Sequence, residues 1–332
     1  MTQFTDSKDV ELVGKLNQSI ESIRKEIKKV IVGQDEIVDS LLVAFLAQGH
    51  CLLVGVPGLA KTLLIRTLAD VLNLNFNRIQ FTPDLMPGDI TGTEIIDEDK
   101  TTHQRNFRFI KGPIFANIIL ADEINRTPPK TQAALLEAMQ EHRVTAAGHS
   151  YTVEEPFFVL ATQNPIEQEG TYPLPEAQLD RFMFNLWLNY PSFNEELEII
   201  KNTTSSYQPN LNKVIDATEI IKYQQLIRRV PVADNVIEFA VKCVSETRVN
   251  STTKDYVKQW VNWGAGPRAS QYLILAAKTK AVMNGRFTPN ISDVKESMIP
   301  VLRHRIIPNF NAEAEGITSV EIINRILQDQ KD

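Results

Sequence analysis

Cysteine and clustered metal ligands are nearly absent from this chain of 332 residues. The only two cysteines are Cys51 and Cys243, and Cys51 falls in an apolar run that reads as a buried strand. A disulfide is therefore not expected, and this cysteine usage fits a reducing cytosol. The five histidines are scattered, and no cluster of cysteine and histidine has the spacing of zinc ligands, so we predict no zinc site.

Long apolar runs and an excess of basic charge are also missing. No stretch approaches the roughly 18 apolar residues that cross a bilayer, and the first six residues lack the apolar core of a signal peptide. The 35 basic and 41 acidic residues leave a net charge of −6, which argues against nonspecific nucleic-acid binding by the chain as a whole. These absences favour a cytoplasmic globular protein without a membrane span.

Strands and helices alternate over the first 190 residues. Helical spacing of apolar residues predicts helices over 8–30 and 63–72. Apolar or alternating runs predict strands over 51–54, 78–82, 118–121, 157–161 and 184–188. This alternation predicts an α/β fold with a parallel five-stranded sheet and helices on both faces.

Two further features set the domain organisation that we expect. Hairpins are predicted at about 93–109 and 143–156, each around a polar or small-residue turn. After Tyr190 the pattern changes, and from Ala217 onward only helical periodicities are found. We therefore expect an α/β domain over 1–190 and an all-helical domain over 191–332.

A glycine-bearing turn links the strand at 51–54 to the helix that follows. Backbone N–H groups of such a turn, together with the positive end of the helix dipole, bind polyphosphates. Lys61 is expected to reach the β and γ phosphates, and the Thr62 hydroxyl to ligate Mg²⁺. The turn consists of Gly55, Val56, Pro57, Gly58, Leu59, Ala60, Lys61 and Thr62. Ala60 replaces the usual glycine, which we expect to be tolerated if this residue has helical φ and ψ angles.

Two carboxylates, Asp122 and Glu123, end the apolar strand at 118–121. Parallel strands bring their carboxyl ends to one edge, so Asp122 can face Lys61. The residue types suit phosphoryl transfer, with Asp122 holding Mg²⁺ and Glu123 polarising the attacking water. An apolar strand followed by two acids also occurs by chance, so this pair alone does not establish the chemistry.

Asn164, Arg181 and Arg268 complete the set of candidate site residues. Asn164 follows the strand at 157–161 and can contact the γ-phosphate or orient the water, although an Asn-Pro turn is the plain alternative. Arginine that stabilises transferred phosphate can come from another chain or domain, which is the role considered for Arg181 and Arg268. Either arginine can equally form a structural salt bridge.

Taken together, the motifs make the chain resemble the MoxR family of AAA+ ATPases over about residues 30–305. They are Gly55–Thr62, Gly112–Phe115, Leu120–Arg126, Gln132–Met139, Ala161–Pro165, Gly170–Phe182 and Pro267–Ala269. Alanine before the lysine is usual in this family. The resemblance implies an AAA+ nucleotide-binding domain over 1–190 and a small helical lid over 191–332.

The same resemblance assigns roles to individual residues. It implies that residues 55–62 form the Walker A loop and that Asp122 and Glu123 form Walker B. Asn164 would be sensor 1 and Arg268 sensor 2, and Gly33 and Gln34 would lie near the adenine. Arg181 would be the arginine finger donated to the neighbouring subunit, with Arg126 as its rival. The two hairpins would be the helix-2 insert and the pre-sensor-1 hairpin.

The implied activity is hydrolysis of ATP with Mg²⁺ by a ring of identical subunits, most often a hexamer. Family members resemble chaperones that remodel or mature other proteins, including metalloenzymes, with partners that carry a von Willebrand A domain. One alternative is an ATP-gated binding module with little hydrolysis, and another is a motor subunit similar to those of magnesium chelatase. A nucleic-acid motor is disfavoured because neither hairpin tip carries clustered lysine and arginine.

Overall fold

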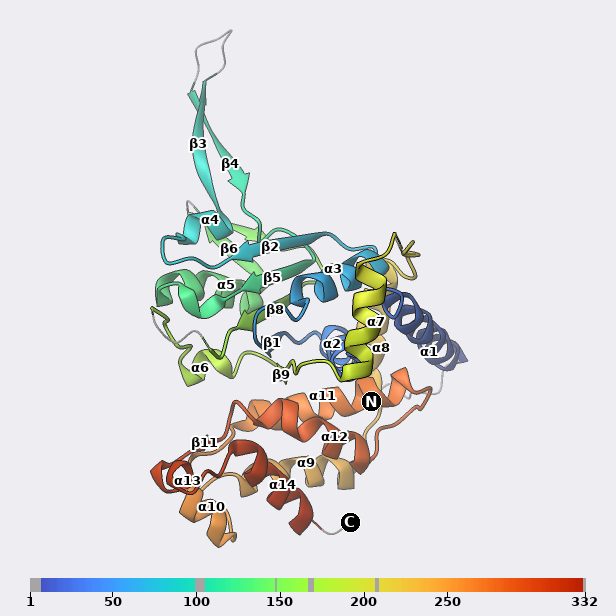
Figure 1. Ribbon diagram of the computed structural model, residues 1–332, viewed down its shortest axis with the longest axis vertical. Coiled ribbons are helices and arrows are strands. Elements are labelled where there is room, and N and C mark those ends of the chain that lie inside the picture. The colour runs from blue at the N-terminus through green and yellow to red at the C-terminus, as the bar shows by residue number, and fades with distance from the viewer. Residues whose placement is uncertain (1–6, 99–104, 147, 167–169, 207–208, 331–332) are drawn as a thin grey trace.

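The computed structural model describes residues 7–98, 105–146, 148–166, 170–206 and 209–330. Its centre is a five-stranded sheet with the order β2-β5-β8-β1-β9, in which all neighbours are parallel (Figure 1). The strands are β1 (Cys51–Val54), β2 (Phe76–Gln80), β5 (Ile118–Asp122), β8 (Phe158–Gln163) and β9 (Phe184–Trp187). The predicted α/β fold is confirmed, although β2 begins two residues earlier than the apolar pattern indicated.

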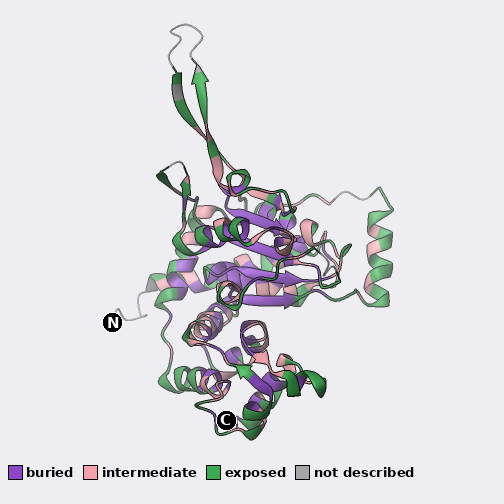
Figure 2. Cartoon of the chain, turned by 90° about the vertical axis from the view of Figure 1, so that its left-hand side faces the viewer, coloured by how far each residue is buried: buried purple, intermediate pink, exposed green. Residues whose placement is uncertain are grey.

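Helices cover both faces of this sheet, as predicted. Alternate residues of each strand point to opposite faces, so Leu53 and Leu120 join one apolar cluster while Leu52 and Ile119 join another. The first cluster continues into the helices before β1 and after β9, and the second includes the buried face of α5 (Pro129–Glu141). Figure 2 shows these buried residues concentrated in the sheet and the helices that pack on it.

The remaining helices of the α/β part surround the sheet. They are α1 (Ser7–Ile27), α2 (Asp35–Leu46), α3 (Lys61–Val71), α4 (Pro87–Thr91), the 3₁₀ turn η1 (Ile124–Arg126) and α6 (Glu176–Leu179). In α1, Leu16, Ile20, Ile23 and Ile27 recur at intervals of three and four residues and are all buried. This spacing explains why the helix predicted over 8–30 forms and which face it packs inward.

Both predicted hairpins are present in the described part of the chain. The first pairs β3 (Gly92–Glu98) with β4 (Arg105–Lys111) and projects far from the sheet (Figure 1). The second pairs β6 (Arg143–Ala146) with β7 (His149–Thr152). The tip of the first hairpin, 99–104, and position 147 of the second lie outside the described residues.

Helices dominate the chain after β9, with one exception to the expected all-helical pattern. Val261–Trp263 (β10) and Ile307–Pro308 (β11) form a short antiparallel pair. Neither run is long enough to show a strand period, so the sequence pattern could not reveal it. The helices are α7 (Phe193–Thr203), α8 (Ala217–Arg229), α9 (Asp234–Glu246), α10 (Asp255–Trp260), α11 (Pro267–Met283), α12 (Ile291–Leu302), α13 (Phe310–Ala314) and α14 (Ser319–Asp329).

Packing joins these helices to the sheet region. Helix α11 lies against α1 and α2, and α12 lies against the edge strand β9. Residues of α8, α9, α11 and α12 belong to the same apolar cluster as one face of the sheet. None of the helices that the structure describes is long and apolar enough to cross a membrane.

The turn between β1 and α3 differs from expectation at one residue. Ala60 precedes the first residue of α3 with φ 55° and ψ 27°, which is the left-handed and not the right-handed helical region. Gly58, two residues earlier, also has a positive φ of 87°. An alanine pays about 1–2 kcal/mol in this region because its Cβ crowds the following carbonyl.

Replacing Ala60 with glycine should therefore stabilise the fold. The strain is removed, and the greater freedom of glycine in the unfolded chain offsets part of the gain, leaving about 0.5–1 kcal/mol. Thermal unfolding of Ala60→Gly should show a higher Tm than the parent chain. Ala69→Gly, inside α3, is the matched control and should lower stability, since glycine costs about 1 kcal/mol in a helix interior. A similar loss in both variants would contradict the assignment of strain to Ala60.

Candidate nucleotide site and a distant arginine edge

Three adjacent strands bring the predicted phosphate-binding and acidic residues to one edge of the sheet. Strands β5, β8 and β1 are neighbours, and Val54 at the end of β1 pairs with Gln163 at the end of β8. The Gly55 amide donates to the Gln163 carbonyl at 3.2 Å, which fixes the start of the glycine-bearing turn beside Asn164. Because the strands are parallel, the residues that follow them meet at their carboxyl edge.

Lys61 bends back over the turn from the first position of α3. Its ammonium donates to the Gly55 carbonyl at 2.5 Å. Burial lowers the pKa of Lys61, and the negative charges of Asp122 and Glu123 oppose this shift. The lysine and both acids therefore share one electrostatic environment at the edge of the sheet, as the spacing predicted.

Asp122 is held by side chains from the strands on either side of it. Arg78 on β2 donates to its Oδ2 at 2.6 and 3.1 Å, and the Thr162 hydroxyl on β8 donates to its Oδ1 at 2.6 Å. Arg78 and Thr162 were not predicted as site residues. The sequence marks both residues only weakly as site residues. Arg78 is an arginine within an alternating strand, and Thr162 is a polar residue at the end of an apolar strand.

Glu123 occupies a strained position immediately after Asp122. Its φ of 59° is left-handed, and its amide donates to the Thr162 hydroxyl at 2.9 Å. The carboxylate accepts from Gln80 at 2.8 Å and from Arg126 at 2.9 Å. Non-glycine residues in this region cost roughly 1–3 kcal/mol and gather at functional sites. The strained backbone at Glu123 therefore marks it as a candidate functional residue.

Asn164 carries a buried polar atom without a partner. The residue is 6% exposed, and its Oδ1 accepts from the Ile166 amide at 3.1 Å. Its Nδ2 has no hydrogen-bond partner among the described residues. Leaving a buried donor unsatisfied is costly, and such a donor beside the phosphate turn is suited to a bound oxygen atom.

A cavity of about 360 Å³ opens next to the phosphate turn. One wall is the segment before α2, another is the turn itself with the start of α3, and α7 forms the third. The size and the largely apolar lining suit a nucleobase. The lining residues are Val30, Ile31, Val32, Gln34, Pro57, Gly58, Leu59, Ala60, Leu63, Leu64, Tyr190, Pro191, Glu196, Ile199, Ile200, Asn202 and Thr203.

The segment at Gly33 and Gln34, for which the resemblance implied a place near the adenine, lies beside the cavity and packs on α7. Gln34 lines the cavity, and Gly33 packs so closely on α7 that an added Cβ would lie 2.3 Å from the Glu195 carboxyl carbon. Gly33 also has a φ of 74°, which favours glycine. The part that Tyr190 and α7 play in lining the cavity was not predicted, because apolar residues at helical spacing resemble ordinary packing.

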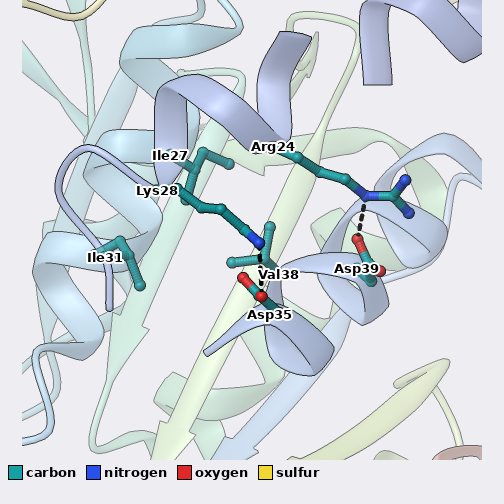
Figure 3. A pocket seen from close by; sticks show the side chains of 7 residues that line it. All are labelled: Arg24, Ile27, Lys28, Ile31, Asp35, Val38 and Asp39. Carbon is teal, nitrogen blue, oxygen red and sulfur yellow. Dashed lines mark hydrogen bonds and ion pairs between the residues drawn. The ribbon is translucent and has the colours of Figure 1, made fainter. Parts of the chain in front are cut away.

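Ion pairs between α1 and α2 brace this segment from behind. Lys28 pairs with Asp35 at 2.7 Å, and Arg24 pairs with Asp39 at 2.7 Å (Figure 3). The two pairs line a small space of about 100 Å³ together with Ile27, Ile31 and Val38. They connect the end of α1 to the start of α2, and so restrain the loop that carries Gly33 and Gln34.

Arg181 and Arg268 do not join this group of residues. Phe184, three residues after Arg181, pairs with Cys51 at the start of β1, whereas the phosphate turn follows the end of β1. Arg181 thus lies at the amino edge of a sheet whose four-residue strand is roughly 13 Å long. Arg268 pairs with Asp180 at 2.9 Å and belongs to this same distant edge.

Arg268 therefore does not line the cavity of its own chain. All residues that line the cavity lie between Val30 and Thr203, and Arg268 contacts the residue next to Arg181 instead. The physical reason is that α11 packs under α1 and α2, so its first turn reaches the amino edge of the sheet. Arg126, the rival to Arg181, lies at the carboxyl edge and is paired with Glu123 of its own chain.

The residues at the carboxyl edge fit Mg²⁺ only together with phosphate. No group of three or more histidine, cysteine, aspartate or glutamate residues forms a metal cluster in the described ranges. Thr62 and Asp122 offer one hydroxyl and one carboxylate, which are hard oxygen ligands. Mg²⁺ is commonly bound by one or two such protein groups plus substrate phosphates and water, so this sparse set is adequate.

Comparisons with known proteins identify the two parts of the chain. Residues 50–184 match the family described as "ATPase family associated with various cellular activities (AAA)", and residues 254–326 match the AAA lid domain. A structure of a protein assigned as an ATPase, from Cytophaga hutchinsonii, superimposes with a TM-score of 0.90 at 40% identity, covering 99% of each chain.

Named relatives show to which family of AAA ATPases the chain is similar. The chain is 44% identical over 304 residues to chaperone MoxR1 of Mycobacterium tuberculosis, covering 91% of this chain and 79% of that protein. It is 44% identical to protein YeaC of Bacillus subtilis, covering 91% of each. Protein MoxR of Methylorubrum extorquens is 28% identical over 85% of each chain. The chain therefore belongs to the MoxR family of AAA+ ATPases.

Proposed function

We propose that this protein hydrolyses Mg·ATP at the interfaces between its own copies, arranged in a ring, and uses the cycle to remodel or mature a partner protein. The observation that carries the proposal is the separation of the site into two halves. The phosphate turn, Asp122, Glu123 and Asn164 share the carboxyl edge, while Arg181 and Arg268 lie at the amino edge. A head-to-tail interface places opposite edges of neighbouring copies together, and such interfaces close into rings.

Each residue at the carboxyl edge has a defined task in this proposal. The backbone amides of 55–62 and the Lys61 ammonium bind the phosphates, and the base lies in the cavity beside Gln34. Thr62 and Asp122 would hold Mg²⁺, which would neutralise phosphate charge. Glu123 accepts a proton from the attacking water, and the free Nδ2 of Asn164 donates to the water or the γ-phosphate.

The two arginines at the amino edge come from the neighbouring copy. Arg181 supplies the positive charge that stabilises the transferred phosphoryl group, and Arg268 lies beside it as the lid residue of the same donor. Arg126 is a weaker candidate for the finger because it already neutralises Glu123 in its own chain. The proposal keeps the domain division near 190, with α7 as the first element of the second part.

The biological role rests on the relatives. MoxR1 of M. tuberculosis is named a chaperone, and we propose a chaperone-like role here, with a protein client and a partner that carries a von Willebrand A domain. A homologue of a magnesium-chelatase subunit from Methanocaldococcus jannaschii is 27% identical over 205 residues, which keeps a chelatase-like motor as the second candidate. An ATP-gated module without turnover is disfavoured by the presence of both Glu123 and Arg181.

Mixing two inactive chains tests the shared site. Lys61→Ala loses phosphate binding, and Arg181→Ala loses about 10³-fold or more in rate, as expected for an arginine finger. An equal mixture should recover about a quarter of parental activity, because a quarter of random interfaces join an intact turn to an intact finger. Steady-state ATPase assays of the mixture measure this. Arg126→Ala in place of Arg181→Ala is the control, and rescue only with that variant would transfer the finger role to Arg126.

Glu123→Gln tests the proposed base. The amide keeps the size of the side chain but cannot accept the proton, so turnover should fall by at least about 10²-fold while ATP binding persists. Size-exclusion chromatography with ATP should then show a long-lived oligomer. Turnover at the parental rate would remove Glu123 from the mechanism.

Gly33→Ala tests the base cavity. The added methyl group meets the Glu195 side chain at a left-handed φ, so either the loop or α7 must move. We expect KM for ATP to rise about tenfold with kcat little changed, which corresponds to about 1.4 kcal/mol of lost binding. Gly14→Ala, in α1 with no atom within 4 Å of the new Cβ, is the matched control and should behave as the parent. An unchanged KM in Gly33→Ala would place the base elsewhere.

A further inference from the structure

The segment that carries Arg181 is bound over its whole length by side chains of α11 and of the residues that follow α12. It comprises Asp180–Met183, between α6 and β9. All four backbone carbonyls of this segment accept hydrogen bonds from residues between 268 and 305. Four consecutive carbonyls with side-chain partners from one distant part of the chain are an uncommon arrangement, because carbonyls normally pair with backbone.

Arg305 makes most of these bonds. Its Nε donates to Asp180 Oδ1 at 2.8 Å, and its Nη2 donates to the carbonyls of Asp180 at 2.8 Å and Phe182 at 2.6 Å. Its Nη1 donates to the Met183 carbonyl at 3.3 Å and to the Val301 carbonyl. All five N–H groups of the guanidinium are thus used. The side chain is only 2% exposed.

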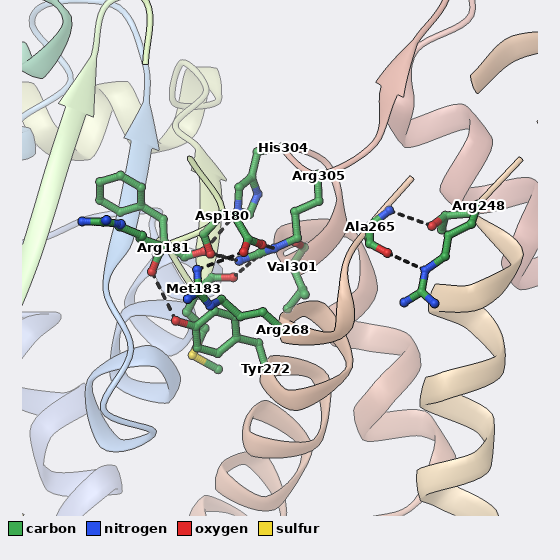
Figure 4. A network of polar contacts seen from close by, with 12 residues as sticks. Asp180, Arg181, Met183, Arg248, Ala265, Arg268, Tyr272, Val301, His304 and Arg305 are labelled. Atoms are coloured by element: carbon green, nitrogen blue, oxygen red, sulfur yellow. Dashed lines mark hydrogen bonds and ion pairs between the residues drawn. The ribbon is translucent and has the colours of Figure 1, made fainter. Parts of the chain in front are cut away.

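Three other residues, Arg268, Tyr272 and His304, complete the contact. We call these three and Arg305 the lid clamp (Figure 4). The Tyr272 hydroxyl donates to the Arg181 carbonyl at 3.2 Å, and His304 Nε2 donates to the Phe182 carbonyl at 3.1 Å. Arg268 binds the second oxygen of Asp180. Asp180 therefore accepts from two arginines, one on each oxygen.

Among the residues that the structure describes, the Arg181 side chain has one hydrogen-bond acceptor. Its Nη1 donates to the Leu136 carbonyl of α5 at 2.7 Å, beside a surface cavity of about 300 Å³ that Glu137, Gln140 and Gln178 also line. Its backbone is fixed, whereas its guanidinium lies at the surface. This division suits a group that must meet a neighbouring copy in a set position.

We propose that Arg305 is a positioning residue that holds Arg181 in the register required by the neighbouring copy's nucleotide. The inference rests on the proposed role of Arg181 as the finger. It adds that the helices after α8 set the finger through a buried arginine, so that a shift of these helices moves the group that a protomer donates to its neighbour. Arg305 is buried against the segment 180–183 and acts on the reaction through that segment.

Loss of Arg305 should leave the chain folded but the segment poorly placed. The Asp180 carboxylate keeps Arg268, and the Arg181 carbonyl keeps Tyr272. The carbonyls of Asp180 and Met183 lose the bonds given above, and a loosened segment carries Arg181 away from its set position. A displacement of about 1 Å is enough to cost about 10²-fold in rate when a group must be oriented.

The test compares Arg305→Gln with Arg181→Ala, alone and mixed with Lys61→Ala. Alone, Arg305→Gln should lose about 10²-fold in kcat. Its KM and its affinity for a fluorescent ATP analogue should stay at the parental values, because its own carboxyl edge is intact. Mixed with Lys61→Ala, it should regain activity to the extent that Arg181→Ala does, since the intact finger then comes from the partner chain. Arg286→Gln is the matched control, because Arg286 pairs with Asp293 away from the clamp and should leave kcat unchanged.

A second variant guards against a folding defect in Arg305→Gln. Tyr272→Phe removes only the hydroxyl that binds the Arg181 carbonyl, and it should lower kcat several-fold with KM unchanged. If Arg181→Ala is inactive while Arg305→Gln and Tyr272→Phe both turn over normally, the positioning role is wrong and the finger assignment stands. If Arg181→Ala itself turns over normally, the proposed function fails first. A defect in Arg305→Gln that Lys61→Ala cannot rescue would also overturn the inference.

Discussion

The parallel pairing of β5, β8, β1 and β9 is the constraint on which the rest of the structure depends. Because these strands run in one direction, everything that follows them lies at one edge and everything that precedes them lies at the other. Lys61, Asp122 and Asn164 follow strands, whereas Arg181 precedes one. The two edges are separated by the length of a strand, roughly 13 Å, and no movement of the Arg181 side chain brings it to Lys61 of the same chain. The division of the candidate site between two edges is therefore a property of the topology and not of a particular loop conformation.

The carboxyl edge balances its charges before any ligand enters. Asp122 is paired with Arg78, and Glu123 with Arg126, so neither acid is left unpaired at a site that already contains a partly buried lysine. The hydrogen bonds from Arg78 and Arg126, at 2.6 and 2.9 Å, orient the two carboxylates. Asn164 Nδ2 is the exception, with no partner in the described ranges. A buried donor without a protein partner is suited to an acceptor from a bound molecule.

The sequence predicted what depends on local pattern and missed what depends on distant contact. Apolar runs located the strands of the sheet, and the glycine-bearing turn, Walker B acids and Asn164 fell where parallel topology required. Ala60 was expected to be right-handed, but turn geometry gives it a left-handed φ that no residue pattern specifies. Arg78 and Arg305 were missed because their partners, Asp122 and Asp180, lie 44 and 125 residues away in the chain. Tyr190 was missed because the cavity that it lines is formed in part by residues 30–64, far from it in the sequence. No sequence spacing marks these three residues as site residues, since they are an arginine on a strand, an exposed tyrosine and an arginine after a helix.

The cavity beside the glycine-bearing turn and the segment 180–183 are held by different parts of the chain. The cavity is lined by the loop before α2, the phosphate turn and α7, while the segment 180–183 is held by α11 and the residues after α12. The two supports meet where α11 packs on α1 and α2, directly behind the ion-paired helices that carry Gly33 and Gln34. A shift of α11 as a body would thus act on the supports of both the cavity and the segment 180–183. Packed helices shift between discrete arrangements because interiors are dense, so communication through this contact is stepwise.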